Sequence, residues 1–190
     1  IALLGQKIVD EYFTKKRNGK YFNITVSVSC FVPKPFTPFQ WQPQDTVSEL
    51  ERKQQLLRNE IKTRKITYNY HTAKVSRLEA VFAKGNRKLS AAIVEAVKQG
   101  QRFDAWDEFF NYEKWMAIFD KVGIDPEFFA NRRIPYDEIL PWDHISCGVT
   151  KDFLISEAKK AESAVTTPDC RTKCSGCGAN SLGGEQRCCR

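Results

Sequence analysis

The residues best suited to chemistry are cysteines near the carboxyl end of the chain. Residues 170–177 read Cys-Arg-Thr-Lys-Cys-Ser-Gly-Cys, so Cys170, Cys174 and Cys177 form a C-x-x-x-C-x-x-C pattern. The small residues between the last two cysteines let backbone N–H groups turn toward the sulfurs and stabilise thiolate ligands. The pattern predicts a metal centre in this tail.

A fourth ligand for this centre is expected from the adjacent pair Cys188 and Cys189. Neighbouring cysteines seldom both bind one ion, and we assign the fourth position to Cys188. Four thiolates suit either tetrahedral zinc or an iron–sulfur cluster. The alternative is a redox-active or disordered tail without metal.

A second group of reactive residues is Asp143, His144 and Cys147. A nucleophilic cysteine needs a base that the fold positions, and closeness in sequence does not supply one. We therefore expect a buried cysteine in a packed loop, with membership of the metal centre as the alternative. His71 is expected to be a packing or loop residue. No pair of carboxylates is placed to act as acid and base, so no catalytic residue is assigned.

Composition limits the class of protein. The chain has 190 residues, of which 42% are apolar, and a net charge of +7. Lys and Arg alternate with Asp and Glu along the chain, which indicates a solvated surface and leaves a nucleic-acid patch as the alternative. Five of the seven cysteines fall within residues 170–189. This clustering is unlike a secreted disulfide scaffold and favours a reducing, cytoplasmic location.

Membrane segments are not expected, because no stretch approaches the ~18 consecutive apolar residues of a spanning helix. The chain begins with Ile1, and Ile1 to Leu4 is too short an apolar run for a signal peptide. We interpret the chain as a piece of a longer protein, or as a processed one.

The segment that must position polar groups is a predicted strand at residues 23–30. Its apolar face carries Ile24, Val26, Val28 and Cys30, and its other face carries Thr25, Ser27 and Ser29. A strand buried on both faces would be apolar throughout. The hydroxyl face therefore indicates either the lining of a polar cavity, such as a barrel interior, or an edge strand with one wet face.

Other elements follow from periodicity and from start and stop signals. Four prolines interrupt residues 33–43, which must form a loop that is packed down by its aromatic residues. A capping box begins a helix at Thr46-Val47-Ser48-Glu49, and a short strand follows at 66–70. Further helices are predicted at 2–16, ended by Asn18-Gly19, and at 75–83, 89–97, 112–122 and 153–161, with a short helical turn after Asp125-Pro126.

One stretch resembles a known family. Residues 26–41 read Val-Ser-Val-Ser-Cys-Phe-Val-Pro-Lys-Pro-Phe-Thr-Pro-Phe-Gln-Trp. They look like the end of the radical S-adenosylmethionine (radical SAM) barrel in uncharacterised bacterial proteins that carry a cobalamin-binding-like domain upstream. Residues 78–87, 103–106 and 140–149 look like the C-terminal region of the same family, as does the tail from Thr167.

The resemblance implies an α/β fold: the last β/α unit of a partial (β/α)6 radical SAM barrel, whose last strand is 23–31. Barrel residues would occupy 1–70, a mostly helical region 71–165, and a Cys-rich metal-binding tail 166–190. Ser29 and Phe31 are the implied cofactor-side residues, and Thr25 and Ser27 would line the substrate cavity. The alternative for each is ordinary barrel filling.

The catalytic 4Fe–4S cluster and most S-adenosylmethionine contacts would then lie in the missing N-terminal barrel region of the parent chain. The tail is not that motif, because only 13 residues follow Cys177 and a barrel must follow the catalytic cysteines. The chain alone is therefore expected to be inactive. The rival hypothesis is a non-enzymatic zinc-knuckle module that binds RNA or protein.

Overall fold

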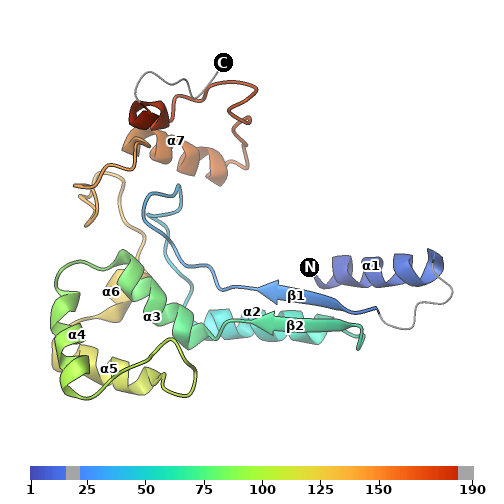
Figure 1. Cartoon of the computed structure of the whole chain (residues 1–190), viewed down its shortest axis with the longest axis horizontal. Coiled ribbons are helices and arrows are strands. Elements are labelled where there is room, and N and C mark those ends of the chain that lie inside the picture. Colours follow the sequence, from blue (N-terminus) through green and yellow to red (C-terminus); the bar gives the residue numbers. More distant parts are fainter. Residues whose placement is uncertain (16–21, 184–190) are drawn as a thin grey trace. The chain divides into compact units, whose positions relative to one another are not determined.

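Two units make up the chain in the computed structural model, which describes residues 1–15 and 22–183 (Figure 1). The first unit contains Ile1–Val32 and Asp45–Glu79, and the second contains Pro33–Gln44 and Ala80–Arg190. The predicted proline-rich loop at residues 33–43, called the Pro-aromatic loop below, therefore belongs to the second unit. In sequence it interrupts the first unit. The expected stop at Asn18-Gly19 lies outside the described residues.

The first unit is built on two parallel strands, β1 (Ile24–Val28) and β2 (Ile66–Tyr70). Their register aligns Ile24 with Ile66 and Val28 with Tyr70. Helix α1 (Ala2–Lys15) precedes β1, and helix α2 (Val47–Glu60) connects the strands. The predicted strands and helices in this unit are confirmed. Parallel strands require such a crossover connection, because a tight turn would reverse the chain direction.

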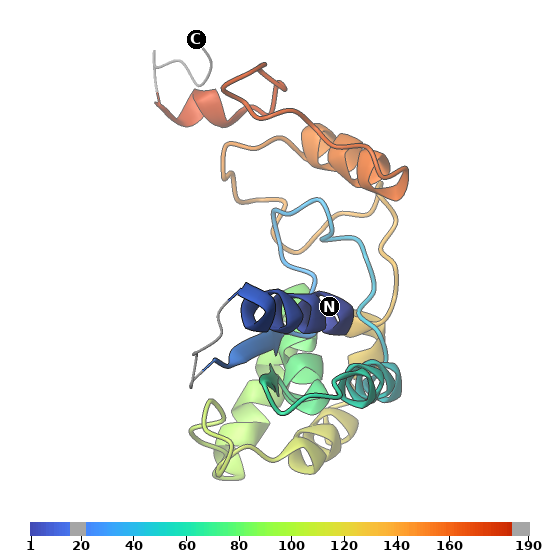
Figure 2. The ribbon, with the colours of Figure 1, turned by 90° about the vertical axis from the view of Figure 1, so that its right-hand side faces the viewer.

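Helix α1 packs on the apolar face of this strand pair. A Cβ atom added at Gly5 of α1 would lie 3.0 Å from Ile66 Cδ1 and 4.0 Å from Val26 Cγ2. Gly5 thus lets the helix backbone approach the sheet closely, and Figure 2 shows α1 in front of β1. The opposite face carries exposed polar residues in both strands. The predicted alternation of β1 is therefore confirmed.

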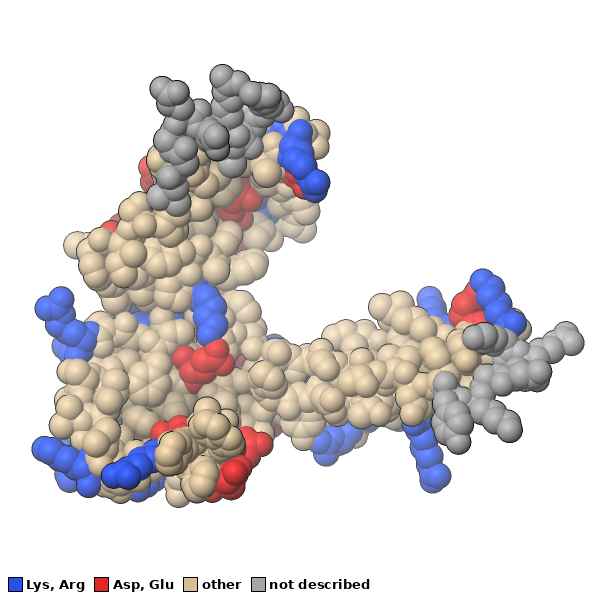
Figure 3. All heavy atoms as spheres, in the orientation of Figure 1, with Lys and Arg blue, Asp and Glu red and all other residues tan. Residues whose placement is uncertain are grey.

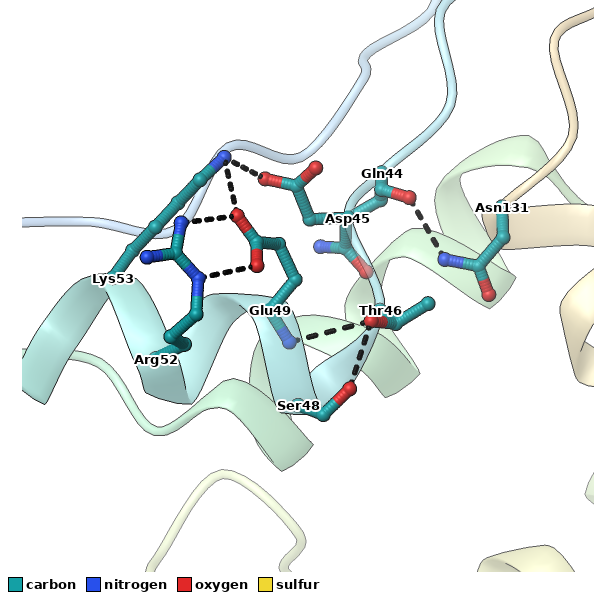
Figure 4. Close-up of polar contacts among 8 residues, drawn as sticks. All are labelled: Gln44, Asp45, Thr46, Ser48, Glu49, Arg52, Lys53 and Asn131. Carbon is teal, nitrogen blue, oxygen red and sulfur yellow. Dashed lines mark hydrogen bonds and ion pairs between the residues drawn. The ribbon is translucent and has the colours of Figure 1, made fainter.

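Polar contacts define the start of α2 (Figure 4). The Thr46 hydroxyl accepts a hydrogen bond from the Glu49 N–H at 3.3 Å, which confirms the threonine half of the predicted capping box. The Glu49 carboxylate instead pairs with the Arg52 guanidinium through bonds of 2.7 and 2.9 Å. This pairing holds the pKa of Glu49 at about 2. Lys53 bonds Asp45 at 2.5 Å, so these exposed charges neutralise one another.

Helices dominate the second unit, as predicted. They are α3 (Ala73–Lys84), which begins in the first unit, α4 (Leu89–Lys98), α5 (Tyr112–Lys121), α6 (Pro126–Ala130), α7 (Lys151–Glu162) and a 3-10 helix, η1 (Ala179–Gly183). The Phe82 ring of α3 lies 5.4 Å from Trp115 and 6.3 Å from Phe119 of α5. These aromatic contacts hold α3 against α5.

The Pro-aromatic loop is fastened to the second unit by Trp41, whose side chain is 0% exposed. Its core partners come from the segment 134–158: Ile134, Leu140, Trp142, Leu154 and Ala158. Beside it the Gln40 side-chain oxygen accepts hydrogen bonds from Trp142 Nε1 at 2.8 Å and from the Phe36 N–H at 2.9 Å. The expectation of a packed loop is confirmed.

Replacing Gln40 by Leu should destabilise the second unit. The substitution leaves the Trp142 indole N–H and the Phe36 N–H without their acceptor, and a buried unsatisfied donor costs about 1–3 kcal/mol. Urea unfolding followed by tryptophan fluorescence measures the change. Gln99→Leu is the matched control, because Gln99 is exposed and its side-chain amide donates to Glu95 on the same helix turn. Equal stability of the two variants would contradict the role given to Gln40.

Candidate functional site

The polar face of the strand pair is the first feature that bears on function. The register places Thr25 beside Thr67 and Ser27 beside Asn69, and all four side chains are exposed. They form a patch of hydroxyl and amide groups without charge. Such a surface can donate and accept hydrogen bonds but cannot move protons at neutral pH.

Two members of this patch were not predicted from the sequence to be site residues. Thr67 and Asn69 alternate with Ile66, Tyr68 and Tyr70, so the period-two pattern of β2 already contained the signal. Their position beside Thr25 and Ser27 depends on the parallel register, which no local pattern specifies. The structure thus enlarges the predicted substrate-side pair to a set of four residues.

The carboxyl ends of β1 and β2 meet at Gln54 of α2. The Gln54 side-chain nitrogen donates to the His71 carbonyl at 2.8 Å and to Cys30 Sγ at 3.3 Å. The Cys30 thiol in turn lies 3.6 Å from the same carbonyl. Gln54 therefore joins the ends of both strands. His71 contributes its backbone here, in keeping with the loop role expected for it.

A cavity of about 490 Å³ lies at this end of the strand pair. Ser29 and Phe31 both line it, so the two predicted cofactor-side residues lie together, whereas Thr25 and Ser27 are not part of its wall. Small-molecule sites have volumes of ~300–1,000 Å³. The cavity is therefore large enough for a ligand of ordinary size.

The walls of this cavity are mostly apolar and come from α1, α2 and the ends of the strands. Its lining residues include Ala2, Leu3, Val28, Leu50, Leu56, Leu57 and Tyr68. Polar groups come from Ser29, Cys30, Gln54, Glu60 and the Lys53–Asp45 ion pair. Burial raises the pKa of the Tyr68 phenol, so this group stays protonated and neutral. Such a cavity suits an apolar or aromatic group that carries a few hydrogen-bonding atoms.

The cysteine tail is described only as far as residue 183. Cys170 and Cys174 are exposed and Cys177 is half-buried, while Cys188 lies outside the described residues. Among the described residues, no three His, Cys, Asp or Glu side chains gather closely enough to hold a metal ion. The metal centre and its fourth ligand therefore stay predictions.

The tail is nevertheless attached to the preceding loop through Cys177. The Thr150 N–H donates to the Cys177 carbonyl at 2.9 Å. A Cβ atom added at Gly178 would lie 2.8 Å from the carbonyl oxygen of Gly148, so a glycine is needed for this close approach. These contacts place Cys177 next to the turn that follows Cys147.

The group of Asp143, His144 and Cys147 does not assemble as a catalytic triad. The Asp143 carboxylate accepts from the Leu140 N–H at 2.9 Å and from Lys151 Nζ at 2.7 Å. His144 is exposed, and the half-buried Cys147 thiol has a long contact of 4.0 Å with the Val149 carbonyl. The Asp143 carboxylate therefore stabilises the loop by bonding the Lys151 side chain and the Leu140 backbone N–H.

Among the residues that the structure describes, charged side chains do not gather into a basic patch on the face seen in Figure 3. Lys and Arg are scattered there, and Asp and Glu lie among them. This face agrees with the mixed-charge surface expected from the sequence.

Over residues 1–15 and 22–183, these features define a mixed α/β protein with a parallel β–α–β unit and a helical second unit. Comparisons with family models, with curated proteins and with solved structures find no match. None of the helices in the described ranges has both the length and the apolar character needed to cross a membrane.

Replacing Gln54 by Ala should make the Cys30 thiol react faster with iodoacetamide. The change removes the amide that donates to Cys30 Sγ and that joins the ends of β1 and β2. Peptide mass spectrometry can follow alkylation at Cys30 separately from the other cysteines, and we expect a several-fold faster rate. Gln55→Ala is the control, since Gln55 is exposed and bonds only to Asn59. Equal rates in the two variants would show that Gln54 does not order this end of the sheet.

Proposed function

We propose that the chain is the C-terminal part of a radical SAM enzyme, as its resemblance to that family implies. The parallel β1–β2 pair is the observation that carries this proposal. One face of the pair is covered by α1, and the other presents only uncharged polar side chains. A strand of a parallel barrel that encloses a ligand cavity would have these properties, because helices cover its outer face and its inner face lines the cavity.

The free edge of β1 supports the same proposal. Among the described residues, β1 pairs with β2 alone. Its other edge therefore presents backbone N–H and C=O groups on which a further strand can be added. We assign this edge to the barrel region that precedes the chain in the parent protein. The resemblance implies that β1 is the last strand of the barrel. In the structure, the sheet continues one strand further, to β2.

Residue roles follow from the direction of the strands. Active sites of parallel barrels lie at the carboxyl ends of the strands. Ser29 and Phe31 lie at this end of β1 and are proposed to contact the adenosyl group of S-adenosylmethionine. Thr25 and Ser27, with Thr67 and Asn69 beside them, lie farther from this end and are proposed to hydrogen-bond a polar, uncharged part of the substrate.

The catalytic 4Fe–4S cluster is assigned to the preceding part of the parent chain. When bound there, such a cluster supplies the electron that cleaves S-adenosylmethionine to methionine and a 5′-deoxyadenosyl radical. The residues of the present chain orient S-adenosylmethionine and the substrate, and they keep water away from the radical. The cytoplasmic location, the upstream cobalamin-binding-like domain and the auxiliary metal at the tail belong to the same proposal.

Replacing Ser29 by Phe in the full-length parent protein should lower the formation of 5′-deoxyadenosine. The added ring would fill the space proposed for the adenosyl group, and misplacing a reacting group costs roughly tenfold or more in rate. The assay is 5′-deoxyadenosine release by the anaerobically reconstituted protein with dithionite as reductant. Ser90→Phe is the control, because Ser90 is exposed on α4.

Three outcomes of this assay would contradict the proposal. The first is equal activity of the Ser29→Phe and Ser90→Phe variants, which would remove Ser29 from the cofactor site. The second is the absence of 5′-deoxyadenosine from the unmodified parent protein. The third is reductive cleavage by residues 1–190 alone, since the proposal places the catalytic cluster outside this segment.

Metal analysis of the tail separates the two functional hypotheses. Purified without oxygen, the chain should contain iron and sulfide, and Cys174→Ala should lose most of both because one of four thiolates is removed. Cys30→Ala is the control, since Cys30 lies in the other unit. Stoichiometric zinc lost in Cys174→Ala would instead favour the zinc-knuckle module. An equal metal content in both variants would exclude Cys174 as a ligand.

A further inference from the structure

A second cavity, of about 110 Å³, lies wholly within the second unit. It is much smaller than the cavity at the strand ends, but a larger share of its lining is polar. Phe128 and Phe129 form part of its wall, and its polar lining residues are Lys84, Asn86, Arg132 and Glu138. None of these residues has a role in the proposed function.

Lys84 is the buried member of this group, with an exposure of only 3%. Its ammonium nitrogen donates to the Gln42 carbonyl at 2.8 Å and to the Arg132 carbonyl at 2.9 Å. An ammonium group has three N–H donors. These two bonds therefore leave one donor of Lys84 for another acceptor in its surroundings.

Arg132 contributes a second positively charged group with an N–H that is not used within the described part of the protein. Its two terminal nitrogens pair with the Glu138 carboxylate, Nη1 to Oε2 at 2.7 Å and Nη2 to Oε1. Its Nε atom is buried and has no acceptor among the described residues. A buried N–H without an acceptor is uncommon and unfavourable. Arg132, which lines the cavity, thus carries a buried donor that the described side chains and backbone do not satisfy.

The charges around the cavity do not cancel. Lys84 and Arg132 are positive and Glu138 alone is negative, so one positive charge remains. Burial, with a smaller effect of Arg132, lowers the pKa of Lys84 to about 8. The lysine is therefore still largely protonated at neutral pH. A buried charge without a counter-ion is costly, and a bound anion would offset this cost.

We propose that this cavity binds a small oxyanion, held by Lys84 Nζ, Arg132 Nε and the side-chain amide of Asn86. The Asn86 oxygen already accepts from the Lys88 N–H at 3.0 Å, which leaves its NH₂ group as a donor. At ~30 Å³ per water the cavity has the volume of three to four waters. It therefore takes a sulfate, a phosphate or a small carboxylate, and excludes a nucleotide.

Binding of this anion would reinforce a junction at which Lys84 already holds three segments of the second unit together. Lys84 ends α3, Gln42 belongs to the Pro-aromatic loop, and Arg132 follows α6. Because Lys84 already bonds the backbone of the other two segments, an anion on Lys84 and Arg132 would stabilise their arrangement. This inference does not depend on the radical SAM proposal.

Isothermal titration with sodium sulfate, at an ionic strength held constant with sodium chloride, tests the site on the whole chain. We expect saturable binding near one equivalent that is lost in Lys84→Met. Lys88→Met is the control, because the Lys88 side chain is exposed and only its backbone N–H bonds Asn86. Parallel titrations with phosphate and acetate show whether tetrahedral or planar oxyanions are preferred. Equal binding to Lys84→Met and wild type would overturn the proposal.

The pH dependence of sulfate binding provides a test that needs no variant. Lys84 faces Arg132 and Glu138, whose pKa values are raised and lowered respectively, so neither group titrates between pH 7 and 9.5. Sulfate keeps its charge over this range. The affinity should therefore fall about tenfold per pH unit above pH 8, as Lys84 loses its proton. A constant affinity, or no binding at pH 7, would exclude Lys84 as the anion-binding group.

A gain-of-affinity variant completes the test if Lys84→Met does not fold. Glu138→Gln removes the carboxylate that competes for Arg132 and raises the positive charge of the cavity by one. Sulfate should bind this variant more tightly than wild type, by tenfold or more. Unchanged or weaker binding would show that the charge of the cavity does not determine its occupancy.

Discussion

The parallel pairing of β1 with β2 is the constraint on which the first unit depends. Parallel strands cannot be joined by a tight turn, so the chain between them must cross over and return through α2. The pairing therefore brings both carboxyl ends to the same edge of the sheet. Gln54 of the crossover helix then joins these ends by bonding Cys30 and the His71 carbonyl. The 490 Å³ cavity lies at this edge because the strand ends, α1 and α2 meet there.

The same pairing separates two chemical environments. Side chains alternate across each strand, and parallel register aligns the polar residues of β1 with those of β2. One face is thus apolar and receives α1, and the other is a continuous uncharged polar surface. The radical SAM proposal uses both faces, since a barrel wall needs an apolar outer side and a cavity-lining inner side. The proposal depends on this alternation and on the family resemblance together.

The second unit relies on polar contacts in its interior as well as on its aromatic core. Gln40 accepts from the Trp142 indole, and Lys84 donates to two backbone carbonyls, so both residues hold segments that are distant in sequence. Buried polar groups of this kind stabilise a fold only when they are paired. Gln40 is satisfied by protein groups. The cavity around Lys84 and Arg132 retains a donor and a positive charge, which is why we assign a ligand to it.

The sequence by itself determined the secondary structure: the alternation of β1, the capping residue Thr46, the packed loop around Trp41 and most helix ends. These are short-range features, because periodicity, capping and glycine stops depend on neighbouring residues. The tertiary structure alone decided the pairing of Ser27 with Asn69, the position of Gln54 and the burial of Lys84. These features arise between residues 17 to 48 positions apart, and such contacts depend on packing and register that no local pattern contains.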